Sequence, residues 1–145
     1  MTVVSDAADE ALSEWVKDLL VTIEDRLLVA ASARTEFVTE VARHITRAGG
    51  KRFRPMLVAL AAGIGRDLGR DVDDESIIKA ALVVELTHVA SLYHDDVMDS
   101  AELRRSAPSA NAVYDNSVAI MVGDFLFARA SSVVATAVPA PAPRG

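Results

Sequence analysis

The chain has 145 residues, a formal net charge of -6 and no cysteine. This length is enough for one domain with a buried core. The negative charge argues against general nucleic-acid binding, which needs a basic surface. The lack of cysteine excludes disulfides, zinc–thiolate sites and thiol catalysis, and it fits a cytoplasmic location.

Almost the whole chain predicts helix, and the alternation typical of strands is absent. Helices are expected over residues 9–30, 35–47, 55–62, 73–100, 110–114 and 116–137, with loops at 66–72 and 106–109. Gly49 and Gly50 end the second helix, and Gly63 and Gly65 break the third, because glycine commonly lies just past a helix end. The sequence therefore predicts an all-α helical bundle over residues 1–138.

Two of these helices are strongly apolar. The helix over 73–100 is apolar nearly all round, so we expect it at the centre of the bundle. The helix over 116–137 carries Asp124 and Arg129 near its middle, and charges there are costly in a bilayer. A buried core helix is therefore expected, and not a transmembrane span.

Neither end of the sequence predicts a packed element. Residues 1–6 lack the basic and apolar segments of a signal peptide. Residues 139–145 alternate proline with alanine, which predicts a disordered, extended tail. This tail follows an apolar helix against which no later element can pack. Exposed apolar surface is expected there, which favours association with other chains.

An acidic cluster lies at the end of the central helix. Asp95 and Asp99 are one helical turn apart and share a face, where like charges repel each other. A divalent cation would turn this repulsion into ligation, and Mg²⁺ usually takes one or two carboxylates together with water and substrate phosphate. With Asp96 between them, these residues predict a Mg²⁺–diphosphate site. Such short acidic patterns also recur by chance on exposed faces.

Two basic clusters flank the acidic one in the sequence. Lys51 can act as a mobile point charge before a helix, and Arg54 as a planar fork for phosphate oxygens. Arg104 and Arg105 follow the acidic cluster closely. Each basic cluster alone is typical of a solvated turn or loop. Together with the carboxylates, they indicate an anion-binding site.

His88 lies on the same helical stripe as Asp95 and Asp99, about 20° around the helix from Asp95 and roughly 10 Å along it. This position favours a functional histidine, although a lone buried histidine is more often a hydrogen-bonded core residue. Glu85 and His88 also have the Glu-x-x-His spacing of di-iron bundles. The second such motif is missing, so the di-iron alternative is less favoured.

Taken together, these motifs resemble the trans-isoprenyl diphosphate synthases of the polyprenyl synthetase family, over residues 37 to about 135. The matching residues are Gly49 to Arg52, Arg54, Pro55, Glu85, Leu86, His88, Ser91, Leu92, His94, Asp95, Asp96, Asp99, Arg104, Arg105, Asn111, Asn116 and Gly123 to Leu126. The resemblance implies the N-terminal part of an isoprenoid-synthase-type fold. It also implies a Mg²⁺-dependent prenyltransferase of isoprenoid biosynthesis that condenses isopentenyl diphosphate with an allylic diphosphate.

The resemblance assigns roles to single residues. Isopentenyl diphosphate would be bound by Lys51, Arg54, His88 and Arg105. Asp95 and Asp99 would hold the Mg²⁺ that carries the allylic diphosphate, with Asp96 supporting them and Arg104 contacting that diphosphate directly. The catalytic residues implied are therefore Asp95, Asp96, Asp99 and Arg104.

The family also relates product length to the residues one turn before the aspartates. Here these are Ala90 and Ser91, whose small side chains would leave the path of the growing chain open. This pattern resembles synthases of longer products, so we expect a product beyond the shortest ones.

The sequence departs from the family pattern in three ways. Ser106 and Asp115 stand where the family usually has glycine, and a second aspartate-rich motif is absent. We therefore expect little or no activity from this chain alone. The alternative is a non-catalytic protein: a truncated relic, or a helical partner that forms a homodimer or associates with a full-length synthase.

Overall fold

The computed structural model describes residues 2–137, with side chains described from residue 8 onward. Over these residues the elements are α1 (Thr2–Ala30), α2 (Glu36–Arg47), α3 (Phe53–Asp67), α4 (Asp74–Met98), β1 (Leu103–Arg104), β2 (Ala107–Pro108), α5 (Ala110–Tyr114) and α6 (Asn116–Ala137). The predicted all-α class is confirmed. The tail predicted at 139–145 lies outside the described residues.

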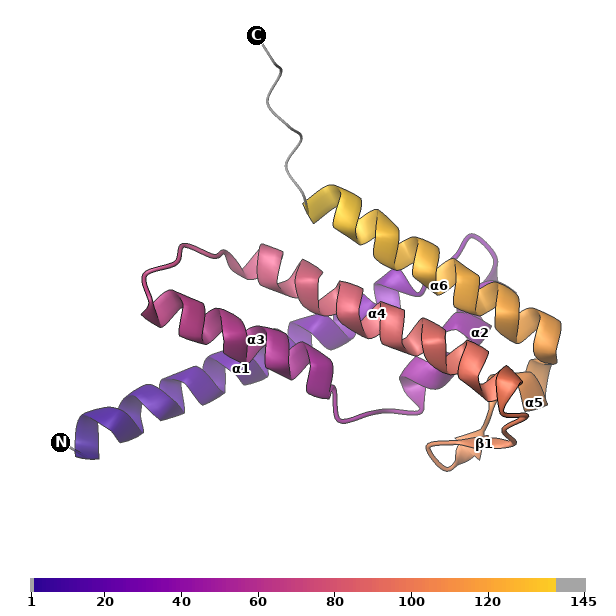
Figure 1. Ribbon diagram of the computed structural model, residues 1–145, viewed down its shortest axis with the longest axis horizontal. Coiled ribbons are helices and arrows are strands. Elements are labelled where there is room, and N and C mark those ends of the chain that lie inside the picture. Colours follow the sequence, from indigo (N-terminus) through magenta and orange to yellow (C-terminus); the bar gives the residue numbers. More distant parts are fainter. Residues whose placement is uncertain (1, 138–145) are drawn as a thin grey trace, which may run out of the picture.

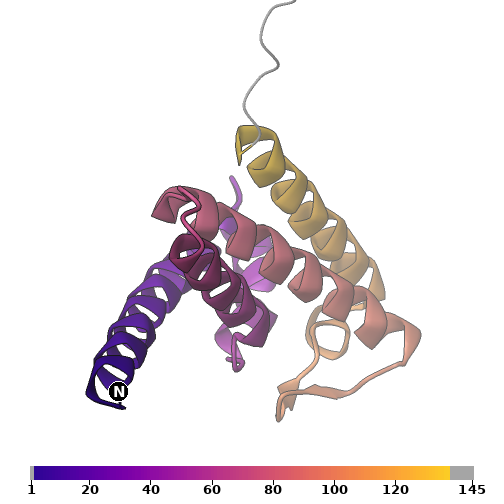
Figure 2. The same ribbon diagram turned by 60° about the vertical axis from the view of Figure 1, so that its left-hand side comes forward.

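Helix α4 is the centre of the bundle, as its sequence predicts (Figure 1). It packs against α6 along most of its length, and against α3 and α1 on other sides (Figure 2). Its Tyr93 side chain is fully buried, and the hydroxyl donates to the carbonyl of Val41 and accepts from the amide of Ile45 at 3.4 Å. Burial raises the pKa of Tyr93 well above its ordinary value. The phenol therefore stays neutral and links α4 to α2.

Helix α3 corrects two expectations. It continues through Gly63 and Gly65 to Asp67, so neither glycine breaks it and the predicted loop at 66–72 begins two residues later. Gly63 is buried where α3 crosses α1, and a Cβ there would lie 2.7 Å from Leu12 Cδ1. The glycine thus permits close helix packing. Helix α1 also begins earlier than predicted, at Thr2.

A small hairpin replaces the loop expected after α4. Strands β1 and β2 pair antiparallel, with Leu103 opposite Pro108 and Arg104 opposite Ala107. The two turn residues, Arg105 and Ser106, have φ values of 52° and 65°. Both central positions of such a tight hairpin turn need positive φ, which explains the geometry. The expectation that the chain forms no strand was therefore wrong here, because two residues per strand leave no visible alternation.

Both positions at which the sequence lacks the family's usual glycine have positive φ. Ser106 is in the hairpin turn, and Asp115 has φ 83° and ψ 165°, a region that is essentially restricted to glycine. The Asp115 side chain compensates by accepting a hydrogen bond from the amide of Val118 at 3.0 Å. Asp115 therefore caps α6, and Ser106 has no comparable compensation among the described hydrogen bonds.

Ser106→Gly should therefore raise the free energy of unfolding by about 0.5–1 kcal/mol, because glycine adopts positive φ without a steric penalty. Urea denaturation followed by circular dichroism measures this change. The matched control is Ser131→Gly on the exposed face of α6, where glycine should destabilise the helix by about 0.5 kcal/mol. An equal loss of unfolding free energy in both variants would contradict the conclusion that the backbone is strained at Ser106.

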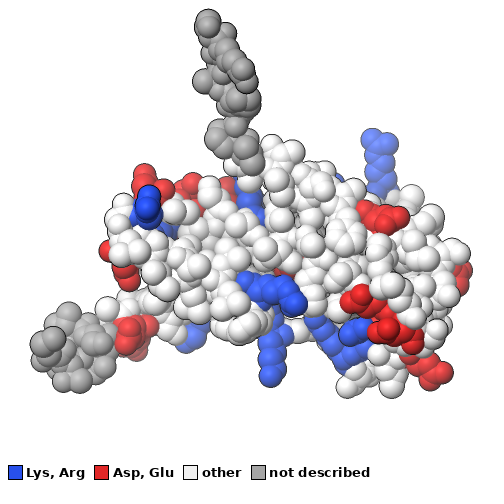
Figure 3. Space-filling model, viewed as in Figure 1, with Lys and Arg blue, Asp and Glu red and all other residues white. Residues whose placement is uncertain are grey.

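Helix α6 is only partly a core helix. It buries Ala119, Val122, Gly123, Leu126 and Ala130, but leaves Ile120, Met121 and Val134 more than 40% exposed. Among the described residues, α4 and α6 are long and apolar enough to span a membrane by length and composition, a test that core helices also meet. Much of the face in Figure 3 is likewise free of charged side chains. The exposed apolar surface expected near the end of the chain is therefore present on α6.

Candidate diphosphate site

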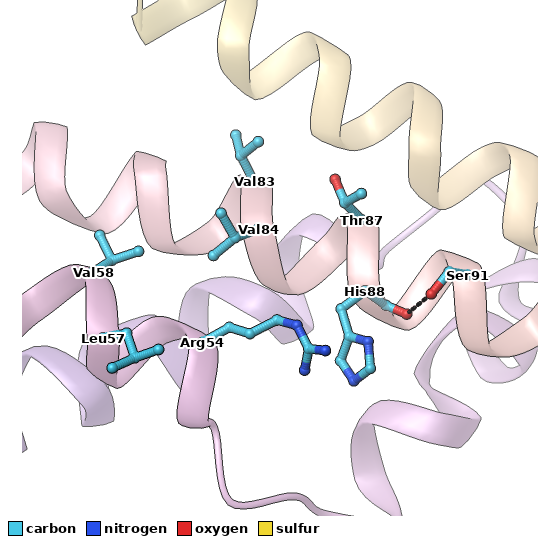
Figure 4. Close-up of a pocket in the computed structure, with 8 residues that line it drawn as sticks. All are labelled: Arg54, Leu57, Val58, Val83, Val84, Thr87, His88 and Ser91. Carbon is cyan, nitrogen blue, oxygen red and sulfur yellow. Dashed lines mark hydrogen bonds between the residues drawn. The ribbon is translucent and has the colours of Figure 1, made fainter.

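A cavity of about 500 Å³ opens between α3 and α4 (Figure 4). Arg54 and His88 lie next to each other at one end of it. The rest of the wall is mostly aliphatic and consists of Leu57, Val58, Val83, Val84, Thr87 and Ser91. A site with cationic groups at one end and apolar walls beyond suits an amphiphilic anion.

Three of the four residues predicted to bind isopentenyl diphosphate lie within electrostatic range of one another: Arg54, His88 and Arg105. Burial lowers the pKa of His88 below its ordinary value, and the positive charges of Arg54 and Arg105 lower it further. Among the described residues, Arg54 and Arg105 have no carboxylate within 4.0 Å. Lys51, the fourth predicted residue, is exposed on the loop before α3. The site therefore offers unpaired positive charge to an anion.

The Arg105 side chain is closely packed. Its guanidinium lies against Gly50, where a Cβ would be 2.7 Å from Nη1. That Nη1 is buried and has no hydrogen-bond partner among the described residues. Burial lowers the pKa of Arg105, and the nearby charge of Arg52 lowers it further. A buried donor without a partner is costly unless a ligand satisfies it.

The predicted acidic cluster divides into two parts. Asp95 is half-buried and Asp99 is exposed, one turn later, with the Asp99 amide donating to the Asp95 carbonyl at 2.8 Å. Asp96 points elsewhere: it is fully buried and accepts from Arg104 Nε at 2.8 Å and from Arg104 Nη2. This hydrogen bond raises the pKa of Arg104, and the charges of the neighbouring aspartates add to the effect. Arg104 thus lies close to the acidic cluster but is engaged by Asp96.

Within the described residues, no group of three or more acidic or histidine side chains is arranged to hold a metal. Asp95 and Asp99 remain as a pair of carboxylates one helical turn apart. This donor set fits Mg²⁺, which needs only one or two protein carboxylates when a phosphate supplies further oxygens. It would not by itself hold an ion that requires a full cage of protein ligands.

The two predicted chain-length residues lie in different environments. Ser91 lines the cavity, and its hydroxyl donates to the carbonyl of His88 at 2.8 Å. Ala90 is fully buried in the bundle and does not line the cavity.

Sequence reasoning missed the function of Arg52 and Glu85. Arg52 donates to both carboxylate oxygens of Glu24, at 2.5 and 2.7 Å, and to Glu85 at 3.2 Å. Glu85 is buried and paired with this arginine, which disfavours the di-iron alternative. The signal that could have revealed the pair was a glutamate inside an apolar helix, since buried carboxylates require a partner.

His94 lies between α4 and α6. Its Nε2 lies 3.2 Å from the carbonyl of Ile120 and 3.4 Å from Asp124, so the ring bridges α4 and α6. Gly123 is buried directly against this ring, and a Cβ there would overlap it.

Gly123→Ala should therefore lower the free energy of unfolding by about 1–3 kcal/mol, the usual cost of overpacking a tight contact. The higher helix propensity of alanine, about 1 kcal/mol, offsets only part of this cost. Thermal or urea unfolding measures the change. Gly65→Ala in α3 is the control, because a Cβ there would make only ordinary contacts, at 3.9 Å or more, with Arg70. Stabilisation by both substitutions would argue against tight packing at His94.

Known proteins resemble this chain over most of its length. The family model of polyprenyl synthetase matches residues 35–143. The chain is 41% identical over 130 residues to a nonaprenyl diphosphate synthase of Mycobacterium tuberculosis, covering 90% of this chain and 38% of that protein. It is 41% identical over 120 residues to heptaprenyl diphosphate synthase component 2 of Geobacillus stearothermophilus, covering 83% of this chain and 36% of that protein.

The fold has the same relatives. The crystal structure of a polyprenyl synthase from Caulobacter crescentus, complexed with calcium and isoprenyl diphosphate, superposes with a TM-score of 0.77 at 32% identity. The superposition covers 88% of this chain and 37% of that protein. The chain thus spans less than two fifths of the length of each of these three relatives. By its sequence and its fold, the chain belongs to the polyprenyl synthetase family.

Proposed function

We propose that this chain binds isopentenyl diphosphate and an allylic diphosphate as part of prenyl diphosphate synthesis. The observation that carries the proposal is the cavity between α3 and α4, with Arg54 and His88 at one end and aliphatic walls beyond. Arg54, His88, Arg105 and the mobile Lys51 bind the diphosphate of isopentenyl diphosphate. The aliphatic walls accept the hydrocarbon and exclude water from the reacting carbon atoms.

The allylic diphosphate is placed at Asp95 and Asp99, with Mg²⁺ as the cofactor. The buried Asp96 supports this site indirectly, because it holds Arg104 beside it. In the reaction the allylic C–O bond breaks, the double bond of isopentenyl diphosphate attacks the resulting cation, and a proton is lost. Mg²⁺ held by Asp95 and Asp99 would stabilise the departing diphosphate electrostatically. Arg104 would contact that diphosphate through the Nη1 donors, which its pairing with Asp96 does not use.

The proposed synthesis gives products longer than the shortest ones of the family. The reason is that the small side chain of Ser91 leaves the cavity open beside His88. In an intact relative, phenylalanine at the position of Ser91 should shorten the products, since the larger ring fills the space that the chain would occupy. Chromatography of the products measures their length. Alanine at the same position is the control and should leave the distribution as it is. An unchanged distribution with phenylalanine would count against this role.

A second candidate function is that of a non-catalytic helical subunit, which would associate with a full-length synthase or with a second copy. Two observations favour it: the exposed apolar side chains of α6, and the name of the relative called component 2 of a heptaprenyl diphosphate synthase. The 145 residues contain no second aspartate-rich motif. We therefore expect little or no turnover by the pure chain in either case.

Cysteine-free composition supports a cytoplasmic location.

Isothermal titration calorimetry tests the proposed binding. Isopentenyl diphosphate should bind without metal, whereas farnesyl diphosphate should require Mg²⁺. Asp95→Asn combined with Asp99→Asn should abolish the Mg²⁺-dependent binding and leave the binding of isopentenyl diphosphate in place. Absence of diphosphate binding would overturn the proposal. Robust turnover by the pure chain would refute the expectation that these 145 residues have little or no activity alone. Turnover that occurs only after mixing with an inactive partner would favour the second candidate function, a helical subunit.

A further inference from the structure

Arg52 forms the centre of an ion-pair network beside the cavity. It joins Glu24 on α1 to Glu85 on α4, and its Nη2 also donates to the carbonyl of Thr46 at 3.0 Å. The Arg52 side chain is only 10% exposed and that of Glu85 only 3%. Bidentate pairing with Glu24 raises the pKa of Arg52 and lowers that of Glu24. Hydrogen bonds to Glu24, Glu85 and Thr46 orient the Arg52 guanidinium, and the Glu24 side chain is 40% exposed at the edge of the network.

The network divides the arginines of the site into two groups. Arg104 is paired with Asp96, and Arg52 with Glu24 and Glu85. Arg54 and Arg105 have no carboxylate within 4.0 Å in the described part of the chain. The carboxylates thus pair with the two arginines that link structural elements. The two arginines at the proposed anion site, Arg54 and Arg105, keep no carboxylate partner within that part of the chain.

The backbone at Arg52 shows why the ion pairs of Arg52 affect the positions of Arg54 and Arg105. Arg52 has φ 45° and ψ 38°, a left-handed conformation that residues other than glycine adopt only when their surroundings enforce it. It directly precedes the first turn of α3, which carries Arg54, and it follows Gly50, which packs against Arg105. An anchor on Arg52 therefore fixes the places of both unpaired arginines.

We infer that Glu24 is a positioning residue for diphosphate binding, which acts by anchoring Arg52 so that Arg54 and Arg105 face the same anion. The inference rests on the proposed function. Glu24 lies on α1, before residue 35, where the match to the family model begins. The N-terminal helix therefore contributes to the site without touching the ligand.

The test compares Glu24→Gln with Glu14→Gln, an exposed glutamate of the same helix without an ion pair among the described residues. Calorimetric titration with inorganic diphosphate should show about tenfold weaker binding for Glu24→Gln, and a change below about twofold for Glu14→Gln. Simple charge attraction predicts the opposite sign, because the loss of a nearby negative charge should tighten anion binding. In ¹H–¹⁵N spectra without ligand, the amides of Gly50 and Arg54 should shift in Glu24→Gln only.

Tighter binding by Glu24→Gln would overturn the inference. So would a lower Tm with unchanged affinity of the folded protein, since that result would assign Glu24 a purely structural role. Absence of binding by the unaltered chain would instead refute the proposed function. In that case the spectra still decide whether Glu24 positions residues 49–52, which lead into α3. Unchanged resonances of Gly50 and Arg54 in Glu24→Gln would contradict this positioning role, and shifted resonances would support it.

Discussion

Arg104→Met should lower the free energy of unfolding by about 3 kcal/mol, because it leaves a buried carboxylate without its partner. Arg104 donates twice to Asp96, whose side chain is fully buried. Methionine would retain the volume of the side chain but leave the buried carboxylate without a counter-charge. Removal of one partner of a buried pair is far more costly than removal of both. Urea denaturation at neutral pH measures the loss.

The double variant Arg104→Met with Asp96→Asn is the matched control for this prediction. It removes the buried charge together with its partner, so it should recover more than half of the stability lost by Arg104→Met alone. Additive losses would show that the ion pair contributes little. The outcome also bears on function, because Arg104 directly precedes Arg105, which is proposed to bind isopentenyl diphosphate.

The helices were largely predictable because their signals are local. Thr35 and Asp73 precede α2 and α4, and each accepts a hydrogen bond from an amide in the first turn, as capping residues do. Gly63 misled the prediction for a physical reason. Glycine ends helices and also permits close helix contacts, and only the position of Leu12 on another helix distinguishes the two. Non-local contacts of this kind are not visible in one sequence.

The candidate site was predictable in its residue types but not in its pairings. The cationic residues and carboxylates stood out because such side chains are rare beside a buried apolar helix. Sequence spacing could not show that Arg52 reaches back to Glu24, 28 positions earlier, or that Asp96 pairs with Arg104. The hairpin turn, which directs Arg104 and Arg105 to different partners, depends on two positive φ values that the side chains themselves do not favour.

Arg105→Met should affect ligand binding and not reduce stability, in contrast to the loss of stability expected for Arg104→Met. It should weaken the binding of inorganic diphosphate about 10- to 100-fold, corresponding to the loss of a charge-assisted hydrogen bond of about 1.5–3 kcal/mol. It should also leave the free energy of unfolding unchanged or raise it. The buried Nη1 of Arg105 has no hydrogen-bond partner among the described residues, and burial already disfavours its charge. Calorimetric titration and urea denaturation of the same samples measure the two quantities.

Arg70→Met is the matched control, because Arg70 is exposed on the loop before α4 and has no ion pair among the described residues. It should change neither quantity by much, since most surface substitutions stay within about 0.5 kcal/mol. A loss of stability in Arg105→Met as large as that in Arg104→Met would mean that Arg105 is a structural residue. Gain of stability with loss of affinity would instead show that the chain keeps an unsatisfied buried cation because a bound anion satisfies it, as expected where binding sites are maintained at the expense of stability.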